Sequence, residues 1–561
     1  MTCESLFRTA KALGVGLALL LFTGASGSVQ SADTGLTVAP ATLAFGTVPL
    51  NVTAATQTVT VTNNGTTGVT FTSILASPSS YSKSGNCPNK GVPLNPGTSC
   101  TISVKFTPTV NGSLPGTLTF TDSDATSPQV VTLSGSGLGP GIIGGPLSGL
   151  TSDQTAAFNN GFTTFNIKWD PTKGLGPVFT QAGCFTCHGS GISAPQGISG
   201  DASTVTGTRY GKWNLDLTFN YLDGNGAMGD KENEGGPIIH GISVSSISGR
   251  IHNCNAVPEV VPADATVVSI LRSPALFGLG LIDSIPESTI LSRSGVDQGM
   301  GVKGFANMVP DELGNLHVGR FGQKDQFPNL LHFTLGAMFN ELGITNMGQG
   351  FTVNHNPQGM PFTKGCNPDA ANMPEDQING VQGVNSVEIY QFEAMLAPVP
   401  TSTGNARAKA NTGKSMFESV GCPLCHVENM QSDPAATVYT SWDQSTNMGV
   451  VASLANQTVN LYSDLLIHTM SAQLSGGIPV SDPNTFAVQV NLNQWRTAPL
   501  WGLSHRRKFG LMHDLRTTDI DTAIRAHGDQ LGDGEAVTII QAYEALSPQD
   551  QASLIAFLGT L

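Results

Sequence analysis

Two copies of the pattern Cys-x-x-Cys-His constrain this 561-residue chain more than any other feature. The copies consist of Cys184, Cys187 and His188, and of Cys422, Cys425 and His426. Two cysteines three positions apart on a helical turn can each form a thioether with a porphyrin vinyl group, and the histidine that follows can then bind the iron. The sequence therefore predicts two covalently attached haem c groups.

The alternative for these cysteines is a reduced thiol pair or half of a zinc site, with a histidine beside it by chance. No further Cys-x-x-Cys lies at zinc-ribbon distance from either copy, and a chance histidine would have to recur at the same offset. Haem attachment is therefore the interpretation that the pattern favours. His188 and His426 would then each bind one face of an iron.

Residues 1–32 are typical of a signal peptide. Arg8 and Lys11 precede an uncharged apolar run at residues 12–22, and small residues follow it. The run is short for a bilayer span, although an uncleaved membrane anchor is the alternative. Attachment of haem to Cys-x-x-Cys-His also requires a compartment outside the cytoplasm. Together these features predict a periplasmic or extracellular protein.

The composition of the chain limits its partners. The formal net charge is −14, with only 12% charged residues, which argues against nucleic acid or anionic lipid as a ligand. No other apolar run reaches membrane-spanning length, so we expect no stable span in the mature chain. The partners expected are a redox partner protein or a small oxidant such as peroxide.

Residues 36–137 differ in sequence pattern from the rest of the chain after them. Short alternating runs, such as residues 57–62 and 101–106, are separated by Asn-Asn-Gly and Asn-Pro-Gly turns. This pattern predicts antiparallel strands and a small all-β, immunoglobulin-like sandwich. A linker rich in glycine and proline follows at residues 138–149. We expect the sandwich to bind, space or tether, because none of its residues looks catalytic.

Helical periodicity begins near residue 150, with one apolar face formed by Phe158, Phe162 and Phe165. It returns at residues 404–420, directly before the second motif. A last helix is predicted at residues 547–558, where a serine cap is followed by a proline at the first helical position. We expect this closing helix to pack across the helix that precedes the second motif.

These signals predict a multidomain fold. After the sandwich we expect two mainly α, cytochrome c-like haem domains, the first at residues 150–400 with long loops and the second at residues 401–561.

Four cysteines remain outside the two motifs and the leader: Cys87, Cys100, Cys254 and Cys366. Four cysteines permit three connectivities. In an oxidising compartment the pair close in sequence, Cys87 and Cys100, is expected to form first, which leaves Cys254 and Cys366 as the second disulfide.

Six blocks of the sequence resemble the di-haem oxidoreductase family, whose members are also called thiol oxidoreductases. The blocks are residues 272–286, 319–324, 338–346, 461–468, 496–503 and 513–528. The family is distantly related to the bacterial di-haem cytochrome c peroxidases and to MauG-type enzymes. The likeness covers the chain from about residue 150 to its end and leaves the sandwich unexplained.

The resemblance implies a peroxidase-like oxidoreductase, in which the second haem relays electrons to a reactive first haem. The alternatives are a pure electron-transfer cytochrome with two closed irons, and a MauG-like or dioxygenase-like enzyme that oxidises a protein or an organic substrate. A further reading makes the haem region ancillary to adhesion through the sandwich.

The resemblance also suggests ligands for the second iron. His527 lies fourteen residues after His513, the offset at which the peroxidase relatives place a distal methionine. We therefore expect His527 to bind the second iron opposite His426, with His513 beside that haem. Met512 is the rival ligand.

The first haem is harder to interpret. His240, in a glycine-rich turn after the first motif, is the leading candidate for a distal ligand, with His252 and His317 next. Asp283 and Glu287 lie in the region where relatives carry a catalytic glutamate, and each could instead be a helix-start or loop charge.

Two positions depart from the family pattern. Gln323 stands where relatives commonly have tryptophan, and Leu515 replaces the glycine of their His-Asp-Gly turn. Trp495 and Trp501 flank the Arg-Thr-Ala-Pro block and could substitute for the missing aromatic ring between the haems.

Overall fold

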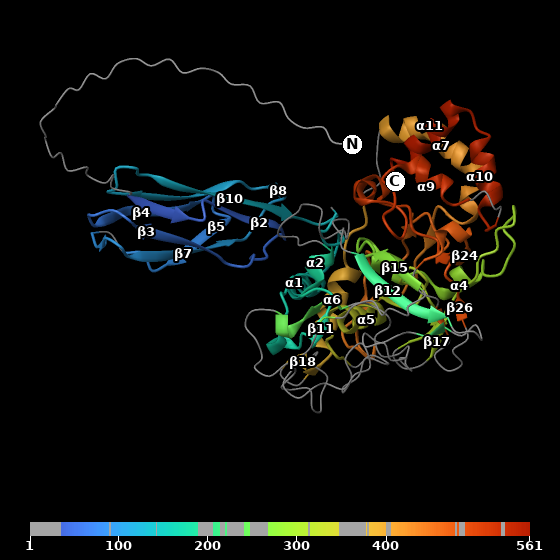
Figure 1. Cartoon of the computed structure of the whole chain (residues 1–561), viewed down its shortest axis with the longest axis horizontal. Helices are drawn as coiled ribbons and strands as arrows, with labels where there is room; N and C mark the ends of the chain where they lie inside the picture. The colour runs from blue at the N-terminus through green and yellow to red at the C-terminus, as the bar shows by residue number, and fades with distance from the viewer. Residues whose placement is uncertain are drawn as a thin grey trace, which may run out of the picture.

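A computed structural model of the chain shows an elongated β module beside a larger region of helices and short strands (Figure 1). The structure describes residues 35–88, 91–141, 143–188, 206–213, 219–220, 240–246, 258, 267–311, 315–346, 377–378, 381–399, 405–476, 480–481, 488–528 and 533–561. The predicted signal peptide, the Cys254–Cys366 disulfide and His252 lie outside these residues. Among the described residues, no helix is long and apolar enough to cross a membrane.

The N-terminal module is a sandwich of two sheets, as the alternating pattern predicts. One sheet has the order β1 (Leu36–Ala39), β3 (Gln57–Asn63), β7 (Ser99–Phe106) and β5 (Tyr81–Gly85). The other has the order β2 (Thr42–Pro49), β10 (Gln129–Leu138), β9 (Gly116–Asp122), β4 (Val69–Ser77) and β6 (Pro93–Leu94), with β8 (Gly112–Ser113) beside β10. The β2–β10 pair is parallel, and the other pairs are antiparallel. The predicted all-β sandwich is confirmed.

The core of the sandwich follows from the alternation along each strand. In β3, Val59 and Val61 are buried, whereas the intervening threonine faces outward. Phe106 of β7 is fully buried and stacks on Tyr81 with ring centroids 4.8 Å apart. Cys87 and Cys100 form a disulfide with an S–S distance of 2.00 Å, which is the pair expected from their proximity in the sequence.

The predicted linker is not a free tether over its whole length. The Leu147 amide donates to the Met395 carbonyl at 2.8 Å, and the Ala397 amide donates to the Gly145 carbonyl at 2.9 Å. Val52 of the sandwich packs against the hydrophobic core of the larger region as well as against its own. The end of the linker is therefore paired to the larger region like a short strand.

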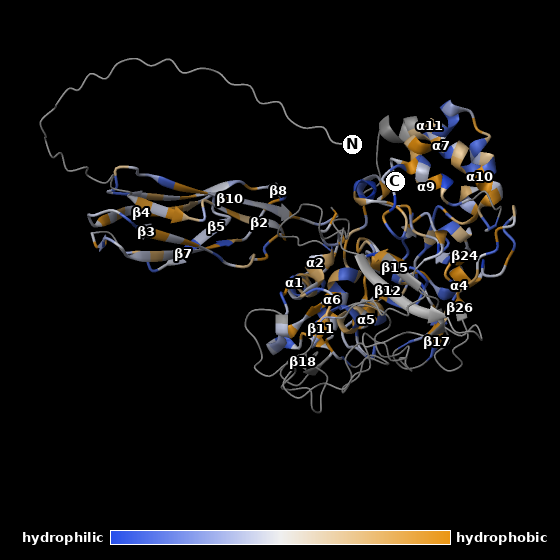
Figure 2. Ribbon diagram, in the orientation of Figure 1, coloured by the Kyte–Doolittle hydropathy of each residue, from blue (hydrophilic) through white to orange (hydrophobic). Residues whose placement is uncertain are grey.

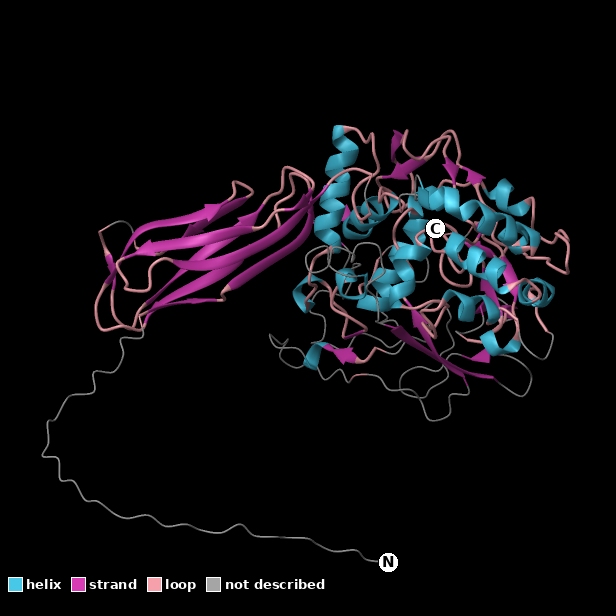
Figure 3. Ribbon diagram, turned by 90° about the horizontal axis from the view of Figure 1, so that it is seen from above, coloured by secondary structure: helices cyan, strands magenta, loops and turns pink. Residues whose placement is uncertain are grey.

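The helices of the larger region are seen together in Figure 3. They are α1 (Ser152–Phe165), α2 (Cys184–His188), α3 (Leu279–Asp283), α4 (Glu287–Leu291), α5 (Leu330–Leu342), α6 (Val384–Ala394), α7 (Asn405–Ser419), α8 (Leu503–Arg506), α9 (Ile520–Arg525), α10 (Val537–Glu544) and α11 (Pro548–Leu558). Thr151 and Gln154 form a capping box on α1, and Ser547 caps α11 as its sequence predicts.

Short strands accompany these helices, so the expectation of mainly α structure is met only in part. Antiparallel pairs are formed by β11 (Val178–Phe179) with β14 (Ile242–Ser243), β16 (Met308–Pro310) with β17 (Leu316–Val318), β18 (Gln377–Ile378) with β19 (Val381–Gln382), β20 (Met430–Gln431) with β23 (Thr458–Val459), β21 (Thr437–Tyr439) with β22 (Asn447–Val450), β24 (Ile467–Thr469) with β27 (Gln494–Arg496), and β25 (Val480–Ser481) with β26 (Val488–Val490). A three-stranded sheet has the order β13 (Phe219–Asn220), β12 (Thr206–Trp213), β15 (Val267–Arg272).

Helices α1 and α6 cross at a glycine. A Cβ atom on Gly161 would overlap the carbonyl oxygen of Glu388, so only glycine lets the two backbones approach this closely. One turn later, Phe165 packs on Phe392 with ring centroids 5.0 Å apart. The close crossing thereby places an aromatic pair beneath the first motif.

Helices α7 and α11 cross in the same way. A Cβ atom on Gly413 would overlap the carbonyl oxygen of Ser553, and Phe417, one turn later, packs on Phe557 with ring centroids 5.5 Å apart. The predicted packing of the closing helix is confirmed. The same arrangement, a close helix crossing at a glycine followed by a phenylalanine pair, thus occurs once before and once after residue 400.

The hydrophobic core does not divide at residue 400. Met430, Val438, Leu454 and Leu465 are buried in the same cluster as the residues of α1, α5 and α6. A separate cluster surrounds α7, α9 and α11, including Phe417. Figure 2 shows apolar residues on the inner sides of both helix groups. The segment between β20 and β24 therefore completes the core of the first helix group.

Candidate functional site

The first motif forms α2, a helix of five residues. Phe165, at the end of α1, lies beside His188 with ring centroids 6.2 Å apart. Cys184 and Cys187 are both half-buried and free of any disulfide. Their thiols are therefore available for thioether bonds, and the helical turn gives them the required three-residue spacing.

Burial controls the protonation of the first motif. It raises the pKa of Cys187 to about 12 and lowers the pKa of His188 to about 4, the latter opposed by the charge of Glu341 and by the Pro274 carbonyl. The Nδ1 atom of His188 is buried and makes no hydrogen bond of good geometry. A neutral, buried imidazole with an unpartnered nitrogen is suited to binding iron.

Two carboxylates that the sequence did not single out act on the first motif. The charge of Glu341 acts on Cys187 and His188, and its Oε2 accepts from the Thr180 hydroxyl at 2.6 Å. The charge of Glu393 acts on Cys184. The only available signal for Glu393 was its position within the apolar run Tyr-Gln-Phe-Glu-Ala-Met-Leu.

Glu393 is buried, and burial raises its pKa to about 7, partly offset by a hydrogen bond with Thr334. The Thr334 hydroxyl lies 2.8 Å from Glu393 Oε2 and 2.9 Å from the Leu330 carbonyl oxygen. A hydroxyl has one proton, so if it donates to the carbonyl, the carboxyl must be the donor to Thr334. The geometry is compatible with a protonated Glu393 near neutral pH.

The predicted catalytic carboxylates, Asp283 and Glu287, each have hydrogen-bonding partners in the structure. Asp283 accepts from the Leu330 amide at 3.0 Å, and burial raises its pKa to about 6 against the charge of Arg320. Glu287 accepts from His317 Nδ1 at 2.7 Å. Asp283 thus binds the first backbone amide of α5, and Glu287 binds the ring of His317.

The candidate distal histidines lie in different settings. His240 is fully buried, and its Nε2 lies 2.6 Å from the carbonyl oxygen of Asn340, next to Glu341. His317 is partly exposed and lies between Glu287 and Asp311. His240 is thus close to a residue that acts on the first motif, but its Nε2 is already engaged.

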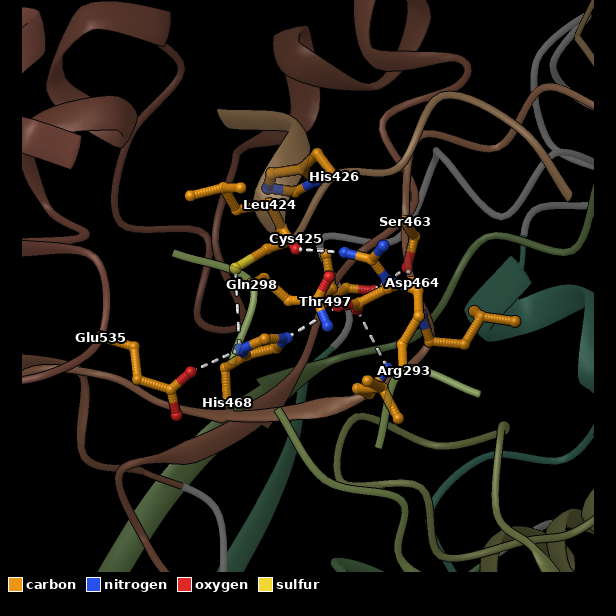
Figure 4. Close-up of polar contacts among 12 residues, drawn as sticks. Arg293, Gln298, Leu424, Cys425, His426, Ser463, Asp464, His468, Thr497 and Glu535 are labelled. Atoms are coloured by element: carbon orange, nitrogen blue, oxygen red, sulfur yellow. Dashed lines mark hydrogen bonds and ion pairs between the residues drawn. The ribbon is translucent and has the colours of Figure 1, made fainter. Parts of the chain in front are cut away.

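The second motif follows α7 almost directly, through Gly421 with φ of 100°. Cys422 begins a 3₁₀ turn, Cys422–Leu424, and the His426 amide donates to the Cys422 carbonyl at 2.9 Å. The Asp464 amide donates to the Cys425 carbonyl at 2.9 Å, and the Arg293 guanidinium donates to the Leu424 carbonyl at 2.8 Å. These contacts, shown in part in Figure 4, hold the backbone of the motif on two sides.

Two histidines near the second motif each contact a backbone carbonyl through Nδ1. The Nδ1 of His426 lies 3.0 Å from the Tyr462 carbonyl oxygen, and the Nδ1 of His527 lies 2.8 Å from the Ala523 carbonyl oxygen. Burial lowers the pKa of both rings, that of His426 to about 4, and the charge of His527 lowers it further. Each ring therefore keeps Nε2 available, and a carbonyl that accepts from Nδ1 is the usual support of a metal-bound histidine.

The donor set suits haem better than a bare metal ion. Within the described ranges, no group of three or more His, Cys, Asp or Glu side chains could hold a metal ion. In haem c the porphyrin supplies four nitrogens, so each motif needs to provide only two thiols and one imidazole. The residues present at both motifs fit that requirement.

Comparison with known proteins agrees with this geometry. Residues 257–561 match the family described as "Di-haem oxidoreductase, putative peroxidase". The chain belongs to the di-haem oxidoreductase family. The matched region contains the second motif, and the first motif lies before it. The family implies haem cofactors and oxidoreductase chemistry.

The sandwich matches a different family. Residues 34–130 match the ASH family, described as abnormal spindle-like microcephaly-associated, ASPM-SPD-2-Hydin. No curated protein matches the chain. The family assignments therefore come from the two family models.

Three solved structures are similar to small parts of this di-haem oxidoreductase. A Porphyromonas gingivalis W83 protein of unknown function has 12% identity and a TM-score of 0.16, covering 18% of this chain and 46% of its own. The ASH/PapD-like domain of human CEP192 has 16% identity and a TM-score of 0.17, covering 22% of this chain and 97% of its own. The Vibrio cholerae protease VesC has 14% identity and a TM-score of 0.15, covering 24% of this chain and 26% of its own. TM-scores below 0.5 support no argument here.

His513 lies in a column of three side chains. Its ring stacks on Trp495 with centroids 4.1 Å apart and planes inclined by 14°, and the Lys324 ammonium lies 3.8 Å from the centroid of the same indole. Lys324 is buried and donates to the carbonyls of Asn491 and Gln494 at 2.7 and 2.6 Å, and to that of Leu492 at 3.2 Å. Three carbonyl acceptors match the three protons of an ammonium, although burial lowers the pKa of Lys324.

The two departures from the family pattern have clear structural settings. The side-chain amide of Gln323 donates to the Arg272 backbone carbonyl at 2.8 Å. The backbone carbonyl of Gln323 accepts from the Arg496 backbone amide at 3.1 Å. Gln323 thus joins two family blocks next to Trp495. Leu515 has φ of 61°, a left-handed conformation that explains why glycine suits this position in relatives.

Met512, the rival ligand, packs against the same hydrophobic cluster as Cys422 of the second motif. It is half-buried, has φ of 69° and packs against the hydrophobic cluster around α7 and α11. The group whose charge acts on His426 is His527. Both His527 and Met512 stay predicted ligands of the second iron.

Proposed function

We propose that this chain is an exported di-haem c-type cytochrome that acts as a peroxidase-like oxidoreductase. The observation that carries the proposal is the difference between the two motif histidines. The charge of a second buried histidine, His527, acts on His426, and each of the two rings contacts a backbone carbonyl through Nδ1, whereas the described groups acting on His188 are Glu341 and a backbone carbonyl. The second haem would relay electrons, and the first would react with the oxidant.

At the second site, His426 and His527 would hold the haem iron. Their Nδ1 atoms donate to the carbonyls of Tyr462 and Ala523, which fixes each ring and its tautomer. Two imidazoles give a low-spin centre of low potential that exchanges electrons and is closed to small oxidants. His513 would remain beside this haem, held by Trp495.

At the first site, Cys184 and Cys187 would hold the porphyrin and His188 would bind the iron. The bound haem would supply the redox chemistry toward peroxide, with electrons arriving from the second haem. Splitting the O–O bond into two waters also consumes two protons. Glu393, whose pKa burial raises to about 7, could hold and release a proton at this motif near neutral pH, and Asp283, Glu287 and His240 remain the sequence-based candidates for the same face.

For the arrangement of the whole chain, we propose the order read from the sequence: signal peptide 1–32, sandwich 36–137, linker 138–149, and haem domains 150–400 and 401–561 in the periplasm or outside the cell. The sandwich would act as a spacer or tether. Because Gly145 and Leu147 pair with residues next to α6, removal of residues before Pro140 should leave both haem spectra unchanged. Loss of a haem in that truncation would make the sandwich part of the redox unit.

The test of the function is electron paramagnetic resonance of the oxidised and half-reduced protein, before and after peroxide. A high-spin signal at one haem, altered by peroxide, supports the proposal. The matched control is a Cys184→Ser/Cys187→Ser variant, which should lose the peroxide response and keep the low-spin centre. Two low-spin haems that ignore peroxide would contradict the proposal and favour a pure electron carrier, and oxidation of an added protein or organic substrate would favour a MauG-like enzyme.

A further inference from the structure

A buried histidine lies between two carboxylates beside the second motif (Figure 4). His468, on β24, has its Nε2 atom 2.9 Å from Asp464 Oδ2 and its Nδ1 atom 2.7 Å from Glu535 Oε2. The side chains of His468, Asp464 and Glu535 are 3%, 0% and 15% exposed. We call these residues the His468 cluster.

The hydrogen bonds determine the charge of His468. A carboxylate accepts hydrogen bonds and does not donate them, so both ring nitrogens of His468 must carry a proton. The side chain is then an imidazolium, and the cluster carries one positive and two negative charges. Burial alone would lower the pKa of His468, but bonds to Asp464, to Cys425 and to Glu535 raise it to about 12.

The cluster contacts the second motif through sulfur and backbone. His468 Nδ1 lies 3.6 Å from Cys425 Sγ, the atom that would form one of the two thioether bonds. The Asp464 amide donates to the Cys425 carbonyl at 2.9 Å, and the charge of His468 also acts on the His426 ring. The charges of the cluster therefore lie at the edge of the proposed haem site.

The carboxylates are fixed by backbone donors and cannot easily move away. Glu535 accepts from the amides of Lys303 at 2.8 Å and Thr469 at 2.9 Å. Asp464 Oδ1 accepts from the Leu466 amide at 3.1 Å. Fixed charges in a buried site act strongly on a neighbouring group because little water screens them.

We propose that the His468 cluster sets the reduction potential of the second haem, with His468 and Glu535 acting as positioning and electrostatic residues and not as iron ligands. This inference rests on the proposed function, because it requires a haem bound at Cys425. Reduction adds one electron to that haem, so a nearby positive charge favours the reduced state and a nearby negative charge favours the oxidised state. His468 and Glu535 should therefore affect the potential in opposite directions.

The test is spectroelectrochemical titration of the full-length holoprotein and of two variants that keep side-chain size. His468→Gln removes the positive charge and leaves two carboxylates, so the potential of the second haem should fall. Glu535→Gln removes one negative charge, so the potential should rise. His317→Gln is the matched control, since His317 also lies between two carboxylates, Glu287 and Asp311, and it should leave the potential of the second haem unchanged.

Opposite shifts in the two variants, both larger than the shift in the control, support the inference. Shifts in the same direction, or none, overturn it, because a cluster that only packs the motif would expose the haem equally in both variants. If His468→Gln does not fold, the direction of the Glu535→Gln shift decides alone. Absence of covalent haem at Cys422 and Cys425 in the wild-type protein would instead overturn the proposed function, and the mass of the denatured chain distinguishes that case.

Discussion

The two motif regions use the same kind of helix crossing but differ in how the chain connects to the motif and in which of the described residues contact it. Gly161 and Gly413 each allow a close helix crossing, and a phenylalanine pair packs beside each crossing. The second motif follows its helix within three residues, whereas the first follows after a longer loop that contains β11. The glycine crossing brings the helices together in the same way in both regions. The regions differ in the length of chain between the helix and the motif.

The surroundings of the motif histidines differ in the same sense. His426 is anchored through Nδ1, the charge of His527 acts on it, and its backbone neighbours are held by Asp464 and Arg293. His188 has an unpartnered Nδ1. A motif whose histidine and backbone are already hydrogen-bonded suits electron transfer, because little needs to rearrange. A motif whose histidine has an unsatisfied polar atom can change its contacts when an oxidant binds. The comparison teaches that two identical motifs need not perform the same chemistry.

The largest expected effect is on covalent attachment. The wild-type chain should carry the mass of two haems after denaturation, because thioether bonds survive unfolding. A Cys422→Ser/Cys425→Ser variant should carry one haem and lose the low-spin signal, and the Cys184→Ser/Cys187→Ser variant should carry one and keep it. Mass spectrometry with electron paramagnetic resonance checks both. Equal spectra for the two single-haem proteins would erase the proposed difference between the regions.

The second prediction concerns the ligand that closes the second site. His527→Ala should turn the second haem high-spin while both haems remain attached, because only His426 would then bind that iron. His527→Met should keep it low-spin and raise its potential, since a thioether is a weaker electron donor than imidazole. Met512→Leu is the control and should leave the low-spin signal intact. A low-spin signal that survives His527→Ala but is lost in Met512→Leu would make Met512 the ligand.

The third prediction uses the buried acid of the first region. Burial raises the pKa of Glu393 from 4.5 to about 7, so between these pH values the folded chain binds a proton that the unfolded chain has released. The free energy of unfolding should therefore fall as the pH rises through this window, by on the order of 3 kcal/mol from this group.

Glu393→Gln should remove that part of the pH dependence, which thermal unfolding at pH 4.5 and pH 7 would detect. Asp283→Asn is a useful comparison, because burial raises the pKa of Asp283 from 3.8 to about 6 and its effect should fall in a lower pH window. If the pH dependence is unchanged in Glu393→Gln, the carboxyl is not buried as the structure shows.

The parts of this molecule that could be predicted from the sequence depend on local chemistry. The strands of the sandwich follow from alternation, the start of α11 follows from Ser547 and the following proline, and the disulfide follows from the short separation of Cys87 and Cys100. Each of these signals lies within a few residues of the feature that it predicts. The interest in His527 came from a family offset, and in the structure the charge of that ring acts on His426; its role as an iron ligand stays a prediction.

The parts that could not be predicted depend on contacts between distant segments. Glu393 reaches Thr334 from another helix, and His468 reaches Glu535 across 67 residues. No local pattern marks a carboxylate that will be buried beside a motif. The core residues between β20 and β24 are apolar in sequence, but nothing there indicates that they pack against α1 and α6.

The smallest expected effect concerns Leu515, in the turn after His513 where relatives have glycine. Its replacement by glycine tests whether the left-handed backbone of this turn strains the leucine. Leu515 is half-buried with φ of 61°, a conformation that costs a leucine about 1–2 kcal/mol. Glycine removes that strain but loses more conformational freedom on folding, about 0.5–1 kcal/mol. Leu515→Gly should therefore raise the free energy of unfolding by up to about 1 kcal/mol, measured by chemical denaturation.

Leu515→Asn, which tolerates this conformation, should have a stability between those of the leucine and glycine proteins, and Leu515→Val should be less stable than the leucine protein. A clear loss of stability in Leu515→Gly would mean that packing of the leucine against Gly510 outweighs the strain, and that this turn has adapted to the larger side chain.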